Sequence, residues 1–278
     1  MHIREYVGLR SGCRNKEYAN SFIRIVKQRY IRNRIYLTRE EQNLIQATPI
    51  LLGGVGIGSV IAECLVRFGF ETITLIDGDV VELSNLNRQN YIESDLATAK
   101  VEALKNRLIA INSNAKITAY NCFITPNTIQ DFVPGHTIAI NALDFTSDVP
   151  LLFDSVCQEH DIPVLHPYNL GWSALVMVIT RDIGLDSLRV ADRPFNELSV
   201  VQHVSDYMRL KNSPQEWLDE TIRKYKAEEE QLSPPQLSIA SWLAAGVCTQ
   251  IIFDLVTGRS VKKFPEFYLT TIWDADAV

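Results

Sequence analysis

A glycine-rich turn is the first feature of this chain that could do chemistry. It reads Gly53-Gly54-Val55-Gly56-Ile57-Gly58 and follows a short apolar run. Glycines between a strand and a helix let the backbone approach phosphates closely, and the helix amino terminus favours negative charge. Asp77 lies 19 residues after Gly58, near the spacing of a carboxylate that holds a ribose hydroxyl. The pattern predicts a nucleotide pocket lined by Gly53, Gly54, Gly56 and Gly58.

Hydrogen-bond donors and positive charges follow the turn. Asn85, Arg88, Gln89 and Lys100 come after the second apolar run. They place donors and cations where nucleotide phosphates would lie, which favours adenylation of a carboxylate over hydride transfer. Val55 stands where the dinucleotide fingerprint has its second glycine. This departure weakens the case for a dinucleotide and leaves open whether Val55 alters the phosphate loop.

Strand-like and helix-like segments alternate around these residues. Such alternation predicts a parallel sheet with helices on both faces. We therefore expect an α/β fold: a doubly wound, Rossmann-like, mostly parallel sheet with an N-terminal helical arm, a C-terminal helical insert and further β-strands. The expected strands are 49–52, 71–76, 116–120, 137–141 and 163–165, followed by a β-rich run at 174–180; the expected helices are 57–68, 97–111, 126–132 and 148–159.

Four regions are expected along the chain. A basic helical arm covers residues 1–47, with an amphipathic helix at 16–30. The nucleotide-binding adenylation domain covers 48–183. A charged helical insert, the crossover, covers 184–236 and is interrupted at Ser213-Pro214. Residues 237–278 complete the domain with an apolar helix at 237–256 and a strand at 266–272.

Composition narrows the class of protein. The 278 residues are 46% hydrophobic, enough to bury a large core. No uninterrupted apolar run reaches the roughly 18 residues of a membrane span, and the N-terminal stretch does not read as a secretory signal, so we expect a cytoplasmic protein without a membrane partner. The five cysteines are scattered and form no Cys-x-x-Cys pair, so no zinc site is expected.

The net charge is unevenly distributed. Residues 1–40 hold ten Lys and Arg against three Glu, a net charge of +7, although the whole chain carries −6. A basic arm can bind nucleic acid, or it can dock on an acidic neighbour such as a second copy of this chain. We favour the packing or dimer contact. The acidic body shows no aromatic and basic interleaving of the sort that grips RNA, so nucleic acid is not the expected partner, although tRNA stays an alternative.

One segment is far more restrictive than the glycine turn. The run Asp79-x-Val81-x-x-Ser84-Asn85-Leu86-Asn87-Arg88-Gln89, with Lys100 after it, resembles the ThiF/MoeB/HesA superfamily of adenylating enzymes related to ubiquitin activation. The resemblance is densest from Leu51 to Trp172 and weaker over 237–271. It implies that ATP is the nucleotide. It further implies the role of each pocket residue: Asp77 holds the ribose, Asp79 lines the pocket, Gln89 supports the loop, and Asn85, Arg88 and Lys100 contact the triphosphate.

The same resemblance implies a metal and a partner subunit. Asp144, in Asn141-Ala142-Leu143-Asp144, matches the family's aspartate that ligates Mg²⁺. Family members also receive an arginine from the partner subunit's N-terminal segment, for which Arg32 and Arg34 are the candidates. A homodimer with two sites is therefore expected. The catalytic set is then Arg88, Lys100, Asp144 and one of the two N-terminal arginines.

The expected reaction activates a carboxylate as an acyl-adenylate with release of pyrophosphate. The resemblance points to the C-terminus of a ubiquitin-like or sulfur-carrier protein, or of a peptide. A thioester step is not expected, because residues 158–247 contain no cysteine and Cys248 lies in an apolar helix pattern. Three alternatives stay open: an enzyme similar to the tRNA threonylcarbamoyladenosine dehydratases, an NAD-dependent oxidoreductase, and the non-catalytic subunit of a heterodimer.

Overall fold

The computed structural model describes residues 28–190, 195–228 and 232–271. Most of the helix predicted at 16–30 lies outside these residues. The chain divides into two compact units, residues 1–43 and 44–278. The sheet and the candidate site belong entirely to the second unit.

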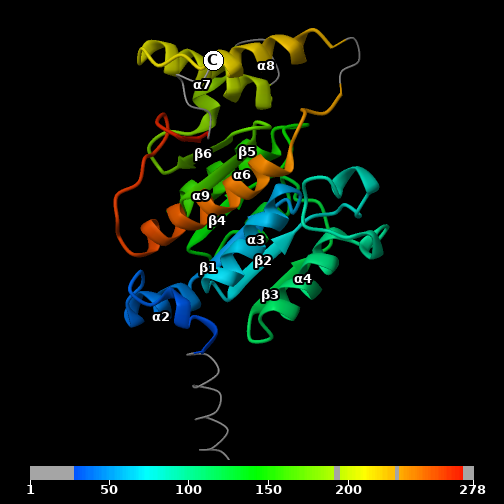
Figure 1. The fold of residues 1–278 in the computed structure, drawn as a ribbon, viewed down its shortest axis with the longest axis vertical. Helices are drawn as coiled ribbons and strands as arrows, with labels where there is room; N and C mark the ends of the chain where they lie inside the picture. Colours follow the sequence, from blue (N-terminus) through cyan, green and yellow to red (C-terminus); the bar gives the residue numbers. More distant parts are fainter. Residues whose placement is uncertain (1–27, 191–194, 229–231, 272–278) are drawn as a thin grey trace, which may run out of the picture. The chain divides into compact units, whose positions relative to one another are not determined.

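Seven strands form a single sheet in the order β3-β2-β1-β4-β5-β6-β7 (Figure 1). The first five are parallel, and β6 and β7 are added antiparallel at one edge. This architecture confirms the predicted Rossmann-like, mostly parallel α/β fold. The bounds are β1 (Pro49–Gly53), β2 (Thr72–Ile76), β3 (Lys116–Tyr120), β4 (Ile138–Asn141), β5 (Val164–Asn169), β6 (Ala174–Ile179) and β7 (Tyr268–Thr270).

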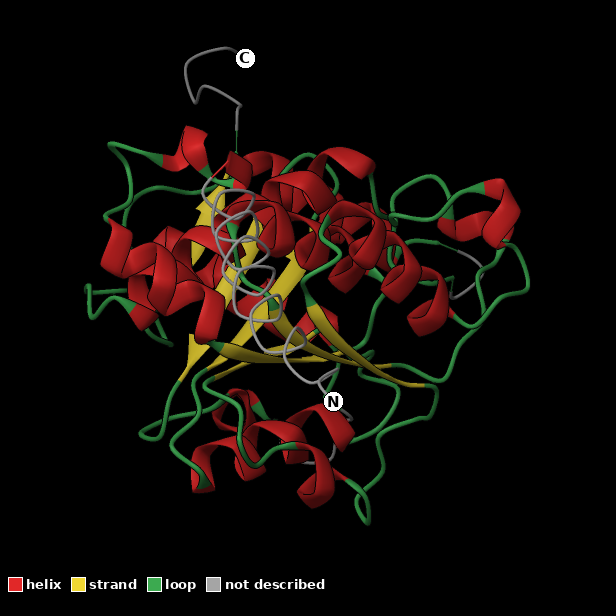
Figure 2. Cartoon of the chain, turned by 90° about the horizontal axis from the view of Figure 1, so that it is seen from below, coloured by secondary structure: helices red, strands yellow, loops and turns green. Residues whose placement is uncertain are grey.

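Helices cover both faces of the sheet (Figure 2). Strand β1 shows how its side chains divide between the faces: Leu52 lies against α3 at Gly58, whereas Leu51 joins the apolar cluster that contains Phe153 of α6. The α-helices are α2 (Arg39–Ala47), α3 (Ile57–Phe68), α4 (Lys100–Ile111), α5 (Ile129–Phe132), α6 (Val149–Glu159), α7 (Glu197–Leu210), α8 (Glu216–Lys226) and α9 (Ser238–Val256).

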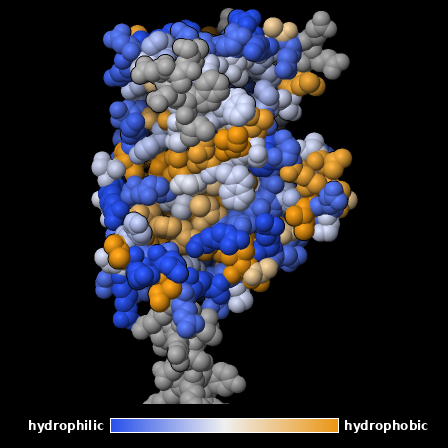
Figure 3. Space-filling view, viewed as in Figure 1, coloured by the Kyte–Doolittle hydropathy of each residue, from blue (hydrophilic) through white to orange (hydrophobic). Residues whose placement is uncertain are grey.

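Helix α9 is apolar on every side. By length and composition it could cross a membrane, but about half of it is buried, as in the core helix of a folded domain. It packs against α3, β5 and β6. Trp242 is 54% exposed on its outer face, and Figure 3 shows apolar side chains gathered on the side of the molecule where α9 lies.

Three elements differ most from the sequence expectation, and α4 and α5 each begin three residues later than predicted. Helix α2 was not predicted, although Thr38 and Glu41 form a reciprocal capping pair at its start. Strand β5 continues four residues beyond the expected Leu165, because it pairs with β6 through Asn169 and the polar His166 within it finds a buried partner. The last strand is shorter than expected, at Tyr268–Thr270, and Ile272 of the predicted strand lies outside the described residues.

Candidate active site

A cavity of about 710 Å³ opens at the carboxyl ends of β1, β2 and β4. In the strand order, β1 and β4 are neighbours whose connections run to opposite sides of the sheet. Ligands of open α/β sheets bind at this kind of switch point. The glycine turn, the segment after β2 and the segment after β4 all line the cavity, so residues far apart in sequence meet there.

The glycine turn leaves no room for side chains at two positions. Gly54 has φ +83°, and a Cβ there would lie 2.3 Å from the carbonyl oxygen of Ala142. A Cβ on Gly58 would lie 2.5 Å from Leu52 Cδ2, so glycine lets α3 approach β1. Gly54 and Gly56 line the cavity. Helix α3 begins at Ile57 without a side-chain cap, which leaves its first N–H groups for a ligand.

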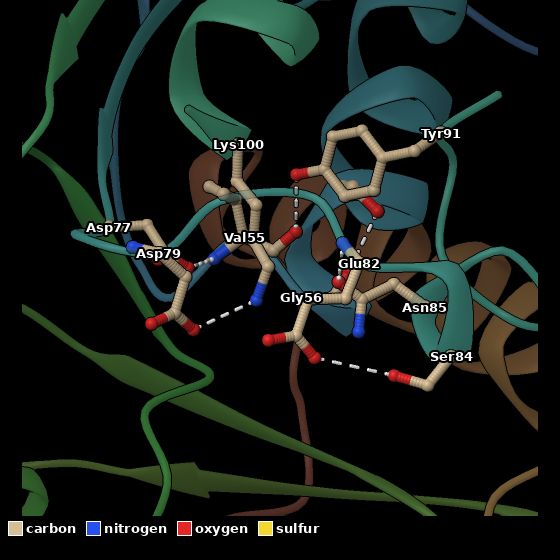
Figure 4. Close-up of polar contacts among 10 residues, drawn as sticks. Val55, Gly56, Asp77, Asp79, Glu82, Ser84, Asn85, Tyr91 and Lys100 are labelled. Atoms are coloured by element: carbon tan, nitrogen blue, oxygen red, sulfur yellow. Dashed lines mark hydrogen bonds and ion pairs between the residues drawn. The ribbon is translucent and has the colours of Figure 1, made fainter. Parts of the chain in front are cut away.

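Val55 points into the core while its backbone is held on both sides (Figure 4). Its N–H donates to Asp77 Oδ2 at 2.7 Å, and its carbonyl accepts from the Tyr91 hydroxyl at 2.9 Å. Asp79 N–H donates to the other oxygen, Asp77 Oδ1, at 2.8 Å. Asp77 therefore joins the glycine turn to the segment after β2. Each of its oxygens keeps a lone pair for a ribose hydroxyl.

The segment after β2 forms a short capped turn. Asn85 is buried, and its Oδ1 accepts from the Glu82 N–H at 3.0 Å (Figure 4). The Asn85 N–H in turn donates to the Glu82 carbonyl at 3.0 Å. Asn85 lines the cavity with Ser84 and Glu82. One side of its amide thus orders the turn and the other side is free to meet a ligand.

Lys100 is a buried cation at the cavity wall. Its Nζ lies 2.8 Å from Asp79 Oδ2, and its side chain is 9% exposed against 48% for that of Asp79. It is also the first residue of α4, where the helix dipole disfavours positive charge. A buried lysine at a helix N-terminus, with only an exposed partner, is a costly arrangement for stability alone. A bound anion would balance it.

Arg88 lies half-buried at the rim of the same cavity. Its Nε donates to Gln236 Oε1 at 2.6 Å, and its guanidinium also donates to the carbonyl of Ser84 at 2.9 Å. Burial lowers the pKa of Arg88, and the nearby carboxylate of Asp144 opposes that shift. Arg88 is therefore oriented over the cavity by contacts that an incoming phosphate could replace.

Asp144 faces the cavity from the segment after β4. Its pKa is raised above the ordinary value, first by desolvation in the cavity wall and then by the carboxylate of Glu197, while Lys100 lowers it. Asp79 and Asp77 add to the rise. Such a concentration of negative charge fits a cation. The described residues hold no group of three metal ligands, so Mg²⁺ here would take its other ligands from phosphates and water.

Gln89 lies beside the glycine turn. Its Nε2 lies 3.3 Å from where a Cβ on Gly56 would be, and its buried Oε1 has no hydrogen-bond partner among the described residues. An orphaned acceptor beside a cavity fits a ligand that supplies a donor. Its predicted role as a support for the loop stays a prediction.

Besides Tyr91, sequence reasoning missed three other residues that make specific contacts in the cavity wall or behind it. Gln236 meets Arg88 from 148 positions away along the chain. Phe123 covers Gly78, where a Cβ would lie 2.7 Å from its ring. Ser59 accepts from the Asn90 N–H at 2.9 Å and donates to the Gly56 carbonyl at 2.6 Å. Only Ser59 had a local signal, a hydroxyl within the first turn after the glycines.

Arg32 and Arg34 belong to the first compact unit. Both are exposed, and Arg34 donates to the carbonyl of Ile31 at 3.0 Å. Their turn contains Ile35 with φ +79°, a conformation that β-branched residues rarely adopt. The structure does not choose between these arginines, and their predicted role stays a prediction.

Comparison with known proteins gives consistent matches. The model of the ThiF family matches residues 28–271. The tRNA threonylcarbamoyladenosine dehydratase of Escherichia coli (strain K12) is 31% identical over 140 residues, 50% of this chain and 52% of that protein. The sulfur carrier protein ThiS adenylyltransferase of Bacillus subtilis (strain 168) is 29% identical over 142 residues, 50% of this chain and 42% of that protein.

The chain thus spans about half the length of these relatives. Among solved structures, the E. coli dehydratase TcdA in complex with ATP superposes with a TM-score of 0.61 at 20% identity, covering 84% of this chain and 95% of that one. At 20% identity, this likeness shows a shared fold and no more.

Proposed function

We propose that this chain, which belongs to the ThiF family, is an ATP-dependent adenylyltransferase that activates a carboxylate as an acyl-adenylate and releases pyrophosphate. One observation carries the proposal: the glycine turn, Lys100, Arg88 and Asp144 all line the same cavity. A hydride-transfer enzyme has no use for two cations and a carboxylate in this arrangement. The acceptor would be the C-terminus of a ubiquitin-like or sulfur-carrier protein, or of a peptide.

The chemistry needs positioning more than proton transfer. A carboxylate is already ionised at neutral pH, so it attacks the α-phosphate without a general base. The barrier then depends on holding the two groups in line and on neutralising charge as pyrophosphate leaves. Lys100 and Arg88 supply positive charge at fixed positions, and the first N–H groups of α3 supply partial positive charge. Mg²⁺, held by Asp144, would neutralise the phosphate oxygens.

The reaction would end at the acyl-adenylate within this chain. Cys248 is completely buried in α9, so its sulfur is closed to an activated acyl group. Burial also raises the pKa of Cys248 far above its ordinary value, which keeps it a thiol. A second nucleophile or enzyme would then take the activated acyl group.

A second copy of this chain would complete each site. Arg32 or Arg34 would reach across to the partner's cavity and add positive charge near the triphosphate. The exposed and strained turn at Ile35, which carries both arginines, supports an intermolecular contact. Mixing Arg88→Ala chains with Arg32→Ala/Arg34→Ala chains tests this arrangement. Partial recovery of activity in the mixture is expected, and no recovery would contradict it.

The proposal is tested by the fate of ATP. The chain is incubated with Mg²⁺, ATP labelled at the α-phosphate and three acceptor pools: small proteins, peptides and tRNA. We expect AMP and pyrophosphate as products and label transferred to a carboxylate in the protein or peptide pool. ADP and inorganic phosphate as the only products would contradict adenylation.

A second candidate acts on tRNA. It is favoured by the 31% identity with a tRNA threonylcarbamoyladenosine dehydratase and by the +7 charge of residues 1–40. Turnover dependent on the tRNA pool alone would select this candidate. Saturable binding of NADH that ATP fails to displace would instead select an oxidoreductase. Binding of ATP without turnover on any pool would select a non-catalytic subunit.

A further inference from the structure

A buried hydrogen-bonded group lies behind the segment that carries Asp144, and the proposed chemistry does not use it. His166 Nε2 lies 2.7 Å from Asp154 Oδ1 and 2.8 Å from Asp154 Oδ2. Asn141 Nδ2 donates to Asp154 Oδ1 at 2.9 Å. The three side chains come from the neighbouring elements β4, α6 and β5 (Figure 1). We call them the Asn141–Asp154–His166 group.

Burying this polar group in an apolar core costs free energy. His166 is 1% exposed, and Asp154 and Asn141 are each 3% exposed. A buried polar pair of this kind is often no more stabilising than apolar side chains of similar volume. Most other positions of the surrounding strands carry apolar side chains, as at Val164 and Leu165 of β5. Stability of the core alone does not account for it.

The group contacts the Asp144 segment at several points. Asn141 Nδ2 donates to the carbonyl of Pro150 at 2.8 Å, which ties the two ends of the segment together. The Leu143 N–H points to Asn141 Oδ1 at 3.4 Å. The ring of Phe145 stacks on that of His166, with centroids 6.3 Å apart and an interplanar angle of 24°. The residues on both sides of Asp144 are therefore tied to the group.

Asp144 needs such support. The carboxylates of Glu197, Asp79 and Asp77 repel that of Asp144, while Lys100 attracts it. The Phe145 N–H also donates to Glu197 Oε1 at 3.1 Å, which fixes the backbone directly after Asp144.

We propose that Asn141, Asp154 and His166 are positioning residues that hold the Asp144 carboxylate toward the nucleotide phosphates and their Mg²⁺. This inference rests on the proposed function. The group acts through the segment 142–146 and touches neither ATP nor the acceptor. Its loss would weaken those interactions of the nucleotide that depend on Asp144 and spare those that depend on the glycine turn and Asp77.

The test replaces the buried pair with apolar side chains of similar size, in the double variant Asp154→Leu/His166→Phe. Affinity is measured by calorimetry for ATP with Mg²⁺ and for AMP without metal. We expect affinity for ATP with Mg²⁺ to fall about tenfold or more while affinity for AMP stays within about twofold. Amide hydrogen exchange in the segment 142–146 should become faster. If the pair were merely structural, the affinities for ATP and AMP would fall together or would both stay unchanged.

His203→Phe is the matched control. His203 also packs among aromatic rings, near Tyr207 and Phe264, and it does not line the cavity. This variant should leave both affinities and the amide hydrogen exchange of residues 142–146 unchanged. If the double variant fails to fold, Asp154→Asn is measured in its place and should show the same selective loss to a smaller extent.

The outcomes separate the two proposals. A wild-type chain that binds neither ATP nor AMP overturns the proposed function, and this inference falls with it. A wild-type chain that binds both, with folded variants whose ratio of ATP to AMP affinity equals that of wild type, overturns the positioning role alone.

Discussion

The two sides of the cavity are held in different ways. On one side, which we call the glycine-turn wall, Gly54, Val55, Asp77 and Tyr91 are joined by hydrogen bonds within the protein. On the other side, the Arg88 rim, the guanidinium is held by Gln236 and by oxygens of its own turn. We therefore expect the wall to meet a nucleotide without rearrangement, whereas the Nε of Arg88 would have to give up its contact with Gln236.

This difference suggests that the glycine-turn wall serves nucleotide binding and the Arg88 rim serves catalysis. Preorganised N–H groups act without reorganisation when charge develops, so the wall can bind the nucleotide at once. The Nε of Arg88 can meet a phosphate only when the Gln236 contact opens. Gln236 lies just before α9, so we expect this segment to shift when Arg88 exchanges its Nε contact for a phosphate.

The largest effect is expected at the wall, for Gly54→Ala. The new Cβ would lie 2.3 Å from a backbone carbonyl oxygen at a residue with φ +83°. We expect the free energy of unfolding to fall by at least about 3 kcal/mol, as measured by urea denaturation. Gly135→Ala is the control: its φ is +87°, yet nothing lies within 4 Å. It should cost only about 1–2 kcal/mol. Equal losses would show that the wall is not closely packed.

The next largest effect is catalytic. Lys100→Met and Arg88→Ala should each raise the barrier of adenylation by about 2–4 kcal/mol, because each removes one fixed positive charge. Pyrophosphate exchange measures the loss. Lys105→Met, on the same helix and away from the cavity lining, is the control and should exchange at the wild-type rate. A rate near wild type for Arg88→Ala would contradict its assignment.

A smaller effect, dependent on pH, is expected behind the wall. Glu63 is paired with Arg67 and Arg107 and bonded to Asn90. Burial alone would raise the pKa of Glu63, but hydrogen bonds from Arg107, Asn90 and Arg67 hold it below its ordinary 4.5. Its stabilisation is therefore complete above about pH 4.5 and is lost as the pH falls through the lowered value.

The variant Glu63→Gln tests this direction of the pH dependence of stability. We expect the variant to unfold about 1–3 kcal/mol more easily than wild type at pH 7. The difference should shrink in acid, because the wild-type carboxylate then becomes protonated too. Thermal unfolding of both proteins between pH 3 and pH 7 measures it. A difference that grows toward low pH would contradict the assignment.

The smallest effect is expected at the rim, for Gln236→Ala. Without its amide partner, Arg88 no longer has to leave a hydrogen bond before meeting a phosphate. Water replaces part of that bond, so we expect ATP to bind only about 2- to 5-fold more tightly. Calorimetric titration measures the gain. Weaker binding in this variant would show that Gln236 itself contacts the nucleotide.

Most of the wall could be predicted from the sequence because its residues are local, although Tyr91 was missed. The glycine turn, Asp77 and the segment through Gln89 lie within 40 residues, and their spacing alone indicates a nucleotide pocket. The alternation of strands and helices also predicted the mostly parallel sheet, but it did not give the strand order. The extension of β5 through His166 was missed, because a polar residue in a strand is explained only by a partner on another element.

The rim and the positioning group could not be predicted in the same way. Gln236 reaches Arg88 across 148 positions, and Asp154 and His166 share no motif. Side-chain pairs of this kind depend on how elements pack rather than on any local pattern. Helix α2 is a different case, because the sequence Thr38-Arg-Glu-Glu41 carries a capping signal that could have been used.

The most direct test of the central claim is exchange of labelled pyrophosphate into ATP by the purified chain, with Mg²⁺ and the small-protein and peptide fraction of a native lysate as acceptor. The account predicts exchange that requires the fraction, disappears when its carboxylates are blocked, and falls at least about 30-fold in Lys100→Met. Exchange that persists undiminished in Lys100→Met and Arg88→Ala, or ATP converted only to ADP with every acceptor, would contradict it.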